Sequence, residues 1–130
     1  MKRIIVLLLI TVMAFTLSGC GNKEYTNISN DELVEMLENP EDYQFVDVRT
    51  LLEYDEEYIP GFDIQINLYN LELDYSLLDQ LDKDKPVVIM CNSGNRSVTA
   101  AMIFHDEGFT EIYNLTDGIQ GWINEGLETE

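Results

Sequence analysis

Cysteine is scarce in this chain of 130 residues, which contains only Cys20 and Cys91. Two cysteines cannot form the disulfide framework that holds many small secreted domains together. The chain has one histidine, His105, so it also lacks the cluster of cysteines and histidines that a structural zinc ion requires. The composition therefore excludes a disulfide-rich scaffold and a zinc-stabilised fold.

Positive charge is also scarce. Seven Lys and Arg residues stand against 25 Asp and Glu residues, which gives a formal net charge of -18. A surface with this charge repels nucleic acid and anionic lipid headgroups, so a role in nucleic-acid binding is excluded. The same charge opposes small anionic substrates at long range, although salt screens this repulsion beyond about 10 Å.

The chain has only one long hydrophobic run, residues 4–17, which follows Lys2 and Arg3. The run is short for a membrane-spanning helix and is typical of a secretory signal peptide. It ends in Leu-Ser-Gly-Cys at residues 17–20, which resembles the lipobox of bacterial lipoproteins. This resemblance implies cleavage before Cys20 and lipidation of Cys20; the alternative is an uncleaved N-terminal anchor. In both cases we expect the remaining chain outside the cytoplasm, attached to a bacterial cell membrane.

These features predict a signal peptide over residues 1–19, a lipidated cysteine with a short tether over 20–26, and one domain over 27–127. About 110 residues suffice for a single domain with a modest core. We expect a monomer that meets the membrane only through its lipid. The acidic C-terminal end, residues 125–130, is interpreted as a solvated tail.

Strands alternate with helices along the rest of the sequence, which predicts an α/β fold with a parallel sheet of about five strands flanked by helices on both faces. Ser29 and Glu32 have the spacing of a capping box at the start of the first helix. The expected strands cover residues 25–28, 44–48, 64–67, 87–90 and 110–114, and the expected helices cover 30–38, 51–58, 75–81, 97–107 and 118–125.

Residues 86–104 contain the candidate site. An apolar strand leads directly to Cys91, and a polar loop then leads to a helix beginning at about Ser97. Backbone N–H groups of such a loop, together with the helix N-terminus, favour negative charge, and the thiolate is the nucleophilic form of cysteine. Arg96 adds a permanent positive charge, and Gly94 is suited to a turn with positive φ. The candidate loop residues are Asn92, Ser93, Gly94, Asn95, Arg96 and Ser97.

Asp47 and Arg49 are candidate supporting residues. They stand at the end of the expected strand 44–48, and ligands of α/β proteins bind at the carboxyl ends of the strands. Two interpretations stay open for this pair. The residues either contribute to the Cys91 site or form a structural ion pair that holds neighbouring loops.

Four segments, in this order, resemble the signatures of single-domain rhodaneses, a family of sulfurtransferases. The resemblance covers nearly the whole chain after the signal peptide. The chain departs from the family pattern at Glu57-Tyr58, where Gly-His is usual, at Asp117, where a glycine is usual, and at Asn92, where many relatives have a basic residue. The four segments are FVDVR at 45–49, Glu53-Tyr54 with Ile-Pro-Gly at 59–61, CNSGNRS at 91–97, and NLTDGIQGW at 114–122.

The resemblance implies a rhodanese-like fold and sulfur transfer through Cys91. In this chemistry, Cys91 takes a sulfane sulfur from a donor such as thiosulfate or a persulfide, becomes a persulfide, and passes the outer sulfur to a thiol or to cyanide. This is covalent catalysis in two steps that needs neither a metal nor an organic cofactor. Arg96 would pair with the anionic part of the donor or brace the loop.

Two other functions fit parts of the sequence. Phosphatases and arsenate reductases also combine a cysteine loop with an arginine, but they generally place five residues between the two, whereas four separate Cys91 from Arg96. The shorter loop favours sulfur transfer. The second alternative is a non-enzymatic module that senses sulfide or oxidants or binds a partner. Such a sensor would accept one sulfur per chain and then stop.

Overall fold

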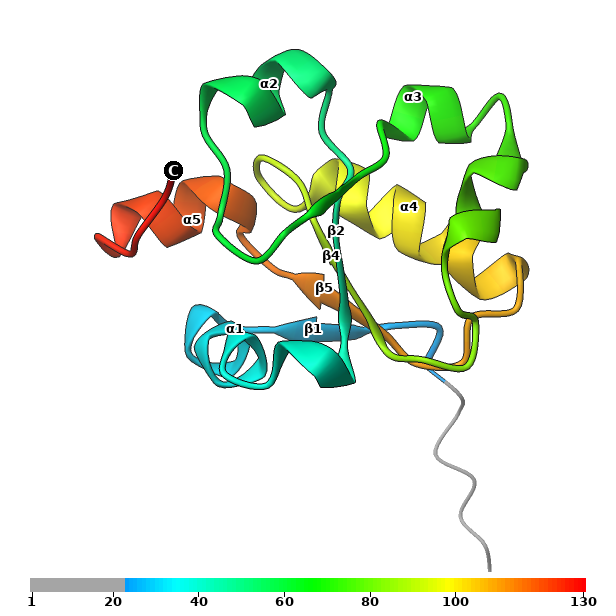
Figure 1. Ribbon diagram of the computed structural model, residues 1–130, viewed down its shortest axis with the longest axis horizontal. Coiled ribbons are helices and arrows are strands. Elements are labelled where there is room, and N and C mark those ends of the chain that lie inside the picture. The colour runs from blue at the N-terminus through cyan, green and yellow to red at the C-terminus, as the bar shows by residue number, and fades with distance from the viewer. Residues whose placement is uncertain (1–22) are drawn as a thin grey trace, which may run out of the picture.

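The computed structural model describes residues 23–130 and has one five-stranded sheet at its centre (Figure 1). All strand pairs are parallel, and the strand order is β1-β5-β4-β2-β3. The sheet confirms the predicted α/β fold. Its strands are β1 (Thr26–Ile28), β2 (Gln44–Asp47), β3 (Ile64–Gln65), β4 (Val87–Met90) and β5 (Ile112–Leu115).

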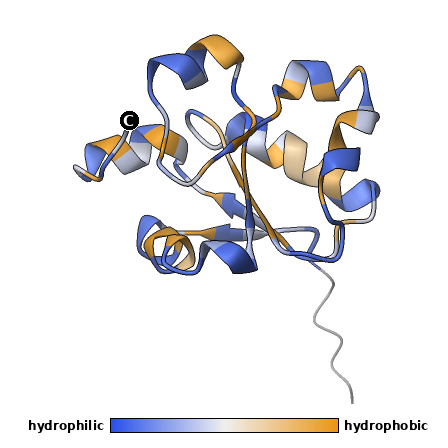
Figure 2. Cartoon of the chain, viewed as in Figure 1, coloured by the Kyte–Doolittle hydropathy of each residue, from blue (hydrophilic) through white to orange (hydrophobic). Residues whose placement is uncertain are grey.

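The central strand β4 is fully buried, because helices cover both faces of the sheet. Its four side chains, from Val87 to Met90, are inaccessible to solvent, which explains why the strand is a continuous apolar run rather than an alternating one. On one face, α1 (Asn30–Leu37) and α5 (Gly118–Asn124) pack over the sheet. On the other face lie α3 (Leu68–Leu71) and α4 (Asn95–Asp106). Figure 2 shows a continuous hydrophobic run along β4, whereas each helix carries both hydrophobic and hydrophilic residues.

Several element boundaries differ from the predicted ones, and the end-capping residues explain two of the differences. The predicted strand 64–67 ends at Gln65, because Asn67 caps α3 by accepting a hydrogen bond from the backbone N–H of Tyr69. Helix α4 begins at Asn95 rather than near Ser97, because Gly94 is its N-cap residue. The predicted helix 75–81 is the 3-10 helix η2 (Tyr75–Gln80), and a further 3-10 turn, η1 (Pro40–Asp42), was not predicted.

The capping box is found at a different helix from the predicted one. At α1, Ser29 Oγ accepts from the backbone N–H of Glu32 at 3.2 Å, which confirms Ser29 as the cap, but the described structure forms no reciprocal bond from Glu32. Both bonds are present at α2 (Leu51–Glu56), between Thr50 and Glu53. This second box places the carboxylate of Glu53 at the carboxyl end of the sheet.

The prediction of a solvated tail over residues 125–130 is wrong. Glu130 and Tyr58 exchange two backbone hydrogen bonds of 2.9 Å each, and the indole N–H of Trp122 donates to the Glu128 carbonyl at 2.7 Å. The Thr129 hydroxyl donates to Glu57 at 2.7 Å. These hydrogen bonds therefore dock the tail against α5 and against the segment that follows α2.

The predicted signal peptide (residues 1–19) and Cys20 lie outside the described residues. Among residues 23–130, none of the helices has the length and hydrophobicity needed to cross a bilayer.

Replacement of Phe104 tests the core on the α4 face. This side chain is completely buried and packs against Phe109 with the two ring centroids 4.8 Å apart. Phe104→Ala should lower the free energy of unfolding in urea by about 3–5 kcal/mol. Leu73→Ala is the control, because Leu73 is 89% exposed, and it should change stability by less than about 0.5 kcal/mol. Similar costs for the two variants would contradict the described core.

Candidate functional site

Cys91 follows β4 directly, at the carboxyl end of the central strand, and is only 1% exposed. Its Sγ atom accepts a hydrogen bond from the backbone N–H of Gly94 at 3.1 Å. The Cys91 thiol also donates a hydrogen bond to Ser97 Oγ at 3.3 Å. The sulfur is therefore held between the loop backbone and the first turn of α4. Of the predicted loop residues, Gly94 and Ser97 make these contacts, whereas Ser93 and Asn95 are exposed.

The loop after Cys91 packs tightly against the turn between β5 and α5. Gly94 has φ +98°, and a Cβ atom at this position would lie 2.0 Å from the carbonyl oxygen of Thr116. Only glycine can combine this backbone angle with so close an approach. The predicted positive φ at Gly94 is thus confirmed, and the close approach is a second reason for the glycine.

Helix α5 fixes the loop from the other side. The backbone N–H of Ile119 donates to the Cys91 carbonyl at 2.9 Å, and that of Gln120 donates to the Asn92 carbonyl at 3.0 Å. Gly118 makes this approach possible, since a Cβ there would lie 2.4 Å from the Cys91 carbonyl oxygen. The sequence did not single out these three residues as part of the site. The only available signal was their place in the fourth family signature.

Arg96 braces the loop through an ion pair with Glu53. Its two Nη atoms donate to the two carboxylate oxygens at 2.8 and 2.7 Å. Thr50 also donates to this carboxylate, from its backbone N–H at 3.0 Å and its hydroxyl at 2.9 Å. The hydrogen bonds from Arg96 are the main reason that the pKa of Glu53 falls to about 2, and the same pair raises the pKa of Arg96. Of the two roles considered for Arg96, the geometry supports bracing.

Asp47 and Arg49 form a buried ion pair. Arg49 donates to both carboxylate oxygens, with Nη2 to Oδ2 at 2.7 Å, and the same Nη2 donates to the Glu57 carbonyl at 2.7 Å. Gln65 donates to the Arg49 carbonyl at 2.6 Å. In the described structure these bonds tie the segments around α2 to the carboxyl ends of β2 and β3 and do not reach Cys91. The geometry supports the structural interpretation of this pair.

An open cleft of about 520 Å³ borders the Cys91 loop at Asn92. Glutamates from α2 and the segment after it form one side, and residues of α5 form the other. Its lining residues are Arg49, Glu53, Glu56, Glu57, Asn92, Ile119, Gln120 and Ile123.

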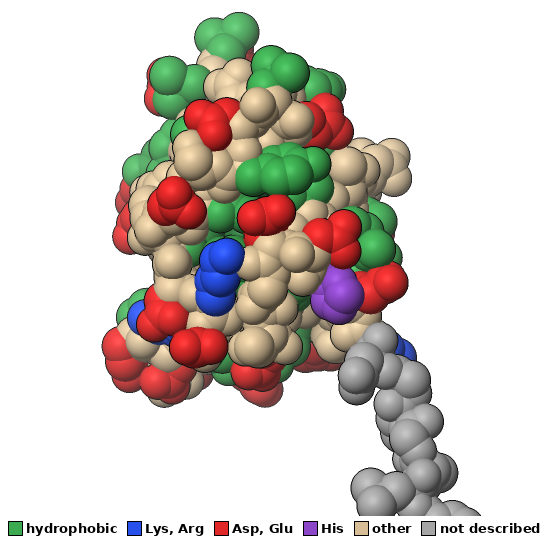
Figure 3. Space-filling view, turned by 90° about the vertical axis from the view of Figure 1, so that its right-hand side faces the viewer, with side chains coloured by type: hydrophobic (Ala, Val, Ile, Leu, Met, Phe, Trp, Pro, Cys, Tyr) green, Lys and Arg blue, Asp and Glu red, His purple; other side chains and the backbone are tan. Residues whose placement is uncertain are grey.

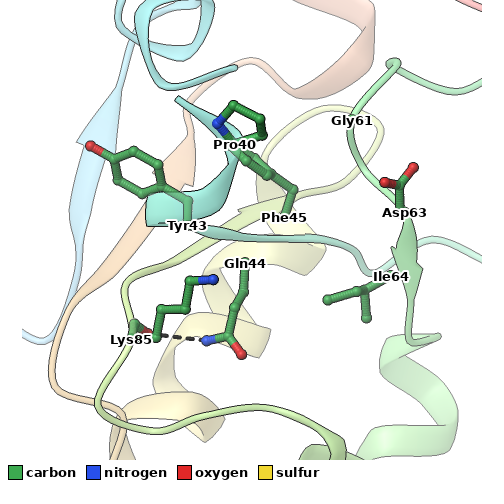
Figure 4. Close-up of a pocket in the computed structure, with 8 residues that line it drawn as sticks. All are labelled: Pro40, Tyr43, Gln44, Phe45, Gly61, Asp63, Ile64 and Lys85. Atoms are coloured by element: carbon green, nitrogen blue, oxygen red, sulfur yellow. Dashed lines mark hydrogen bonds between the residues drawn. The ribbon is translucent and has the colours of Figure 1, made fainter. Parts of the chain in front are cut away.

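A second pocket, of about 240 Å³, lies elsewhere and contains no residue of the Cys91 loop (Figure 4). Its wall includes Gln44 and Lys85, which stand at the start of β2 and just before β4. These are the amino ends of the strands, whereas Cys91 lies at the carboxyl end. The cleft beside Asn92 is therefore the candidate substrate space. In residues 23–130, no three His, Cys, Asp or Glu side chains are grouped so that they could hold a metal ion.

Residues 29–125 match the model of the rhodanese-like domain family. The chain belongs to this family. The resemblance inferred from the four signatures is thereby confirmed, with the rhodanese-like domain spanning most of the chain.

Relatives of this rhodanese-like domain carry sulfurtransferase names. The chain is 29% identical to the thiosulfate sulfurtransferase GlpE of Glaesserella parasuis over 107 residues, which cover 82% of this chain and 94% of the relative. It is 33% identical to a sulfurtransferase of Allochromatium vinosum over 100 residues, covering 77% and 90% of the two chains. These matches assign the chain to a family of sulfurtransferases.

Solved structures agree with this assignment. A rhodanese-related protein from Thermoplasma volcanium is 29% identical, with a TM-score of 0.66, over 82% of this chain and 98% of that one. A rhodanese-like domain protein from Staphylococcus aureus is 31% identical, with a TM-score of 0.65, over 79% and 96%. The five-stranded parallel sheet is thus the fold of this family.

Replacement of Gly94 tests the close approach of the loop to the turn after β5. Gly94→Ala should lower the free energy of unfolding by at least about 3 kcal/mol in urea denaturation, because the new methyl group must displace the Thr116 carbonyl in addition to tolerating positive φ. Gly126→Ala is the matched control, since Gly126 has φ +74° but no atom within 4 Å of the added Cβ. It should cost only about 1–2 kcal/mol. Equal costs would show that the backbone angle alone requires Gly94.

Titration of Glu53 should make its contribution to stability depend on pH. Because pairing with Arg96 lowers the pKa of folded Glu53 from 4.5 to about 2, the unfolded chain binds more protons between these values. The stability difference between the parent and Glu53→Gln should thus be complete above pH 4.5 and disappear as the pH falls toward 2. Urea unfolding at a series of pH values measures it. Asp55→Asn, which removes a charge from the same helix, is the control. A stability difference between the parent and Glu53→Gln that stays constant from pH 4.5 to 2 would show that the pKa of folded Glu53 is not lowered.

Proposed function

We propose that the protein is a sulfurtransferase in which the Cys91 thiolate takes a sulfane sulfur from thiosulfate or a persulfide and delivers it to a thiol or to cyanide. The observation that carries this proposal is the backbone N–H of Gly94, which points at Cys91 Sγ from a loop held in place by α5. The family membership and the sulfurtransferase names of the relatives support the same chemistry.

The first step forms one S–S bond and breaks another. The Cys91 thiolate attacks the outer sulfur of thiosulfate, the S–S bond of the donor breaks, and sulfite leaves with the electron pair. The product is an anionic Cys91 persulfide. The N–H of Gly94 stabilises the starting thiolate through the bond seen here, and the positive end of α4 faces the same atom.

The second step returns the enzyme to its starting state. Cyanide attacks the outer sulfur of the persulfide, thiocyanate leaves, and the electron pair of the broken S–S bond regenerates the Cys91 thiolate. A thiolate acceptor reacts in the same way and leaves as a persulfide. The protein's part is to position Cys91 and to stabilise anionic sulfur, and the steps themselves consume no other reactant.

The geometry around Arg96 favours sulfur transfer over phosphate or arsenate chemistry. A phosphatase loop needs its arginine to contact the oxyanion directly, whereas both Nη atoms of Arg96 bond to Glu53. The loop is also one residue shorter than the usual phosphatase loop. In the same proposal, the protein lies outside the cytoplasm of a bacterial cell, anchored through a lipid on Cys20, and acts as a monomer.

Intact mass spectrometry tests the reaction. Incubation with thiosulfate should add one sulfur, about 32 Da, to the protein, and cyanide should remove it while thiocyanate accumulates over many turnovers. Cys91→Ser should neither gain the sulfur nor form thiocyanate. A single loading without turnover would favour the sensor instead, and absence of loading from both thiosulfate and polysulfide would refute the enzymatic proposal.

A further inference from the structure

Positive charge near the Cys91 loop is already neutralised. Of the five Lys and Arg residues in the described part of the chain, only Arg49 and Arg96 lie at the carboxyl end of the sheet. Arg49 is paired with Asp47, and Arg96 is paired with Glu53. The remaining three are Lys23, Lys83 and Lys85. They precede β1 and β4 and thus lie at the amino ends of the strands.

Acidic side chains are widely distributed on the surface. In Figure 3, they are spread over the whole visible face, whereas Lys and Arg side chains are visible only in its lower half. The cleft beside Asn92 contributes Glu56 and Glu57 in addition to Glu53. A dianion that approaches Cys91 through this cleft therefore meets carboxylates and no unpaired cation among the described residues.

Glu53 is a fixed part of this environment rather than a mobile surface charge. Three hydrogen-bonding groups hold its carboxylate: the Arg96 guanidinium, the Thr50 backbone N–H and the Thr50 hydroxyl. A donor anion can engage Arg96 only by displacing or sharing this carboxylate. The repulsion between the donor and the Glu53 carboxylate rises with the negative charge of the donor.

We propose that Glu53 determines donor specificity, because its charge disfavours dianionic donors such as thiosulfate relative to donors that carry less negative charge. This inference rests on the sulfurtransferase function proposed above. The carboxylates of Glu56 and Glu57, which line the same cleft, add to this repulsion. Glu53 itself does not touch the reacting sulfur, so it acts through Arg96 and through its charge.

A series of three donors with related reactive ends separates charge from chemistry. Thiosulfate carries two negative charges, ethanethiosulfonate carries one, and 2-aminoethanethiosulfonate has no net charge. In each case the Cys91 thiolate attacks the outer sulfur, and sulfite or the corresponding sulfinate leaves with the electron pair. The rate of loading is the appearance of the Cys91 persulfide by intact mass at low ionic strength.

For the parent protein, 2-aminoethanethiosulfonate should load faster than ethanethiosulfonate, and added salt should narrow the difference. Glu53→Gln should raise the thiosulfate rate constant by about tenfold and that of 2-aminoethanethiosulfonate by less than about twofold. The comparison of variant with parent for each donor cancels the donor's intrinsic reactivity. Asp55→Asn removes the same charge from an exposed position of α2 outside the cleft, and it should leave all three rates within about twofold.

Three results would overturn the inference. An equal loss of all three rates in Glu53→Gln would show that Glu53 only supports the fold, and an equal gain of thiosulfate loading in Asp55→Asn would show a nonspecific effect of net charge. A parent protein in which added salt leaves the ratio of the 2-aminoethanethiosulfonate and ethanethiosulfonate rates unchanged would contradict the proposed electrostatic preference without any variant. Absence of loading from every donor would instead refute the sulfurtransferase function itself.

Discussion

The candidate site depends on two hydrogen bonds that helix α5 donates to the carbonyls of Cys91 and Asn92. These bonds fix the first two peptide units of the loop, whose carbonyls point toward α5. The N–H of Gly94 then reaches Cys91 Sγ. Because α5 is the last helix of the chain and β4 is the central strand, the site forms only when the C-terminal part of the domain has packed onto the sheet.

Two arginines stabilise the surroundings of Cys91 without offering free positive charge. Arg49 joins Asp47 to the segment after α2, and Arg96 joins the loop to α2 through Glu53. Both bonds hold α2, which has no buried residue of its own, in place over the carboxyl end of the sheet. Both arginines of the described residues thus serve the structure. A rhodanese-like domain of this charge must stabilise anionic sulfur mainly through backbone N–H groups and a helix N-terminus.

The sequence predicted the parts of the fold and site that depend on local patterns. The apolar run at Val87–Met90 indicated a buried parallel strand, and the order of the signatures placed Cys91 at its end. The partner of Arg96 was not predictable in this way, because Glu53 is 43 residues distant and the direction of a long side chain depends on tertiary packing. Helix α3 is too short for its periodicity to show. The docked tail was missed because an acidic composition says nothing about its backbone bonds to Tyr58.

Burial of Cys91 affects each step of the proposed transfer and also the oxidation of its thiol. In a persulfide, the sulfur that an acceptor attacks is the outer one, which lies one S–S bond, about 2 Å, beyond Sγ. In the second step Sγ itself can therefore stay enclosed, whereas the first step requires the outer sulfur of the donor to reach Sγ. Oxidation of cysteine depends on exposure as well as on thiolate character, so an enclosed Sγ is less open to oxidants between turnovers. Among the described residues Cys91 has no second cysteine with which to form a disulfide, and burial is then the protection that the fold can supply.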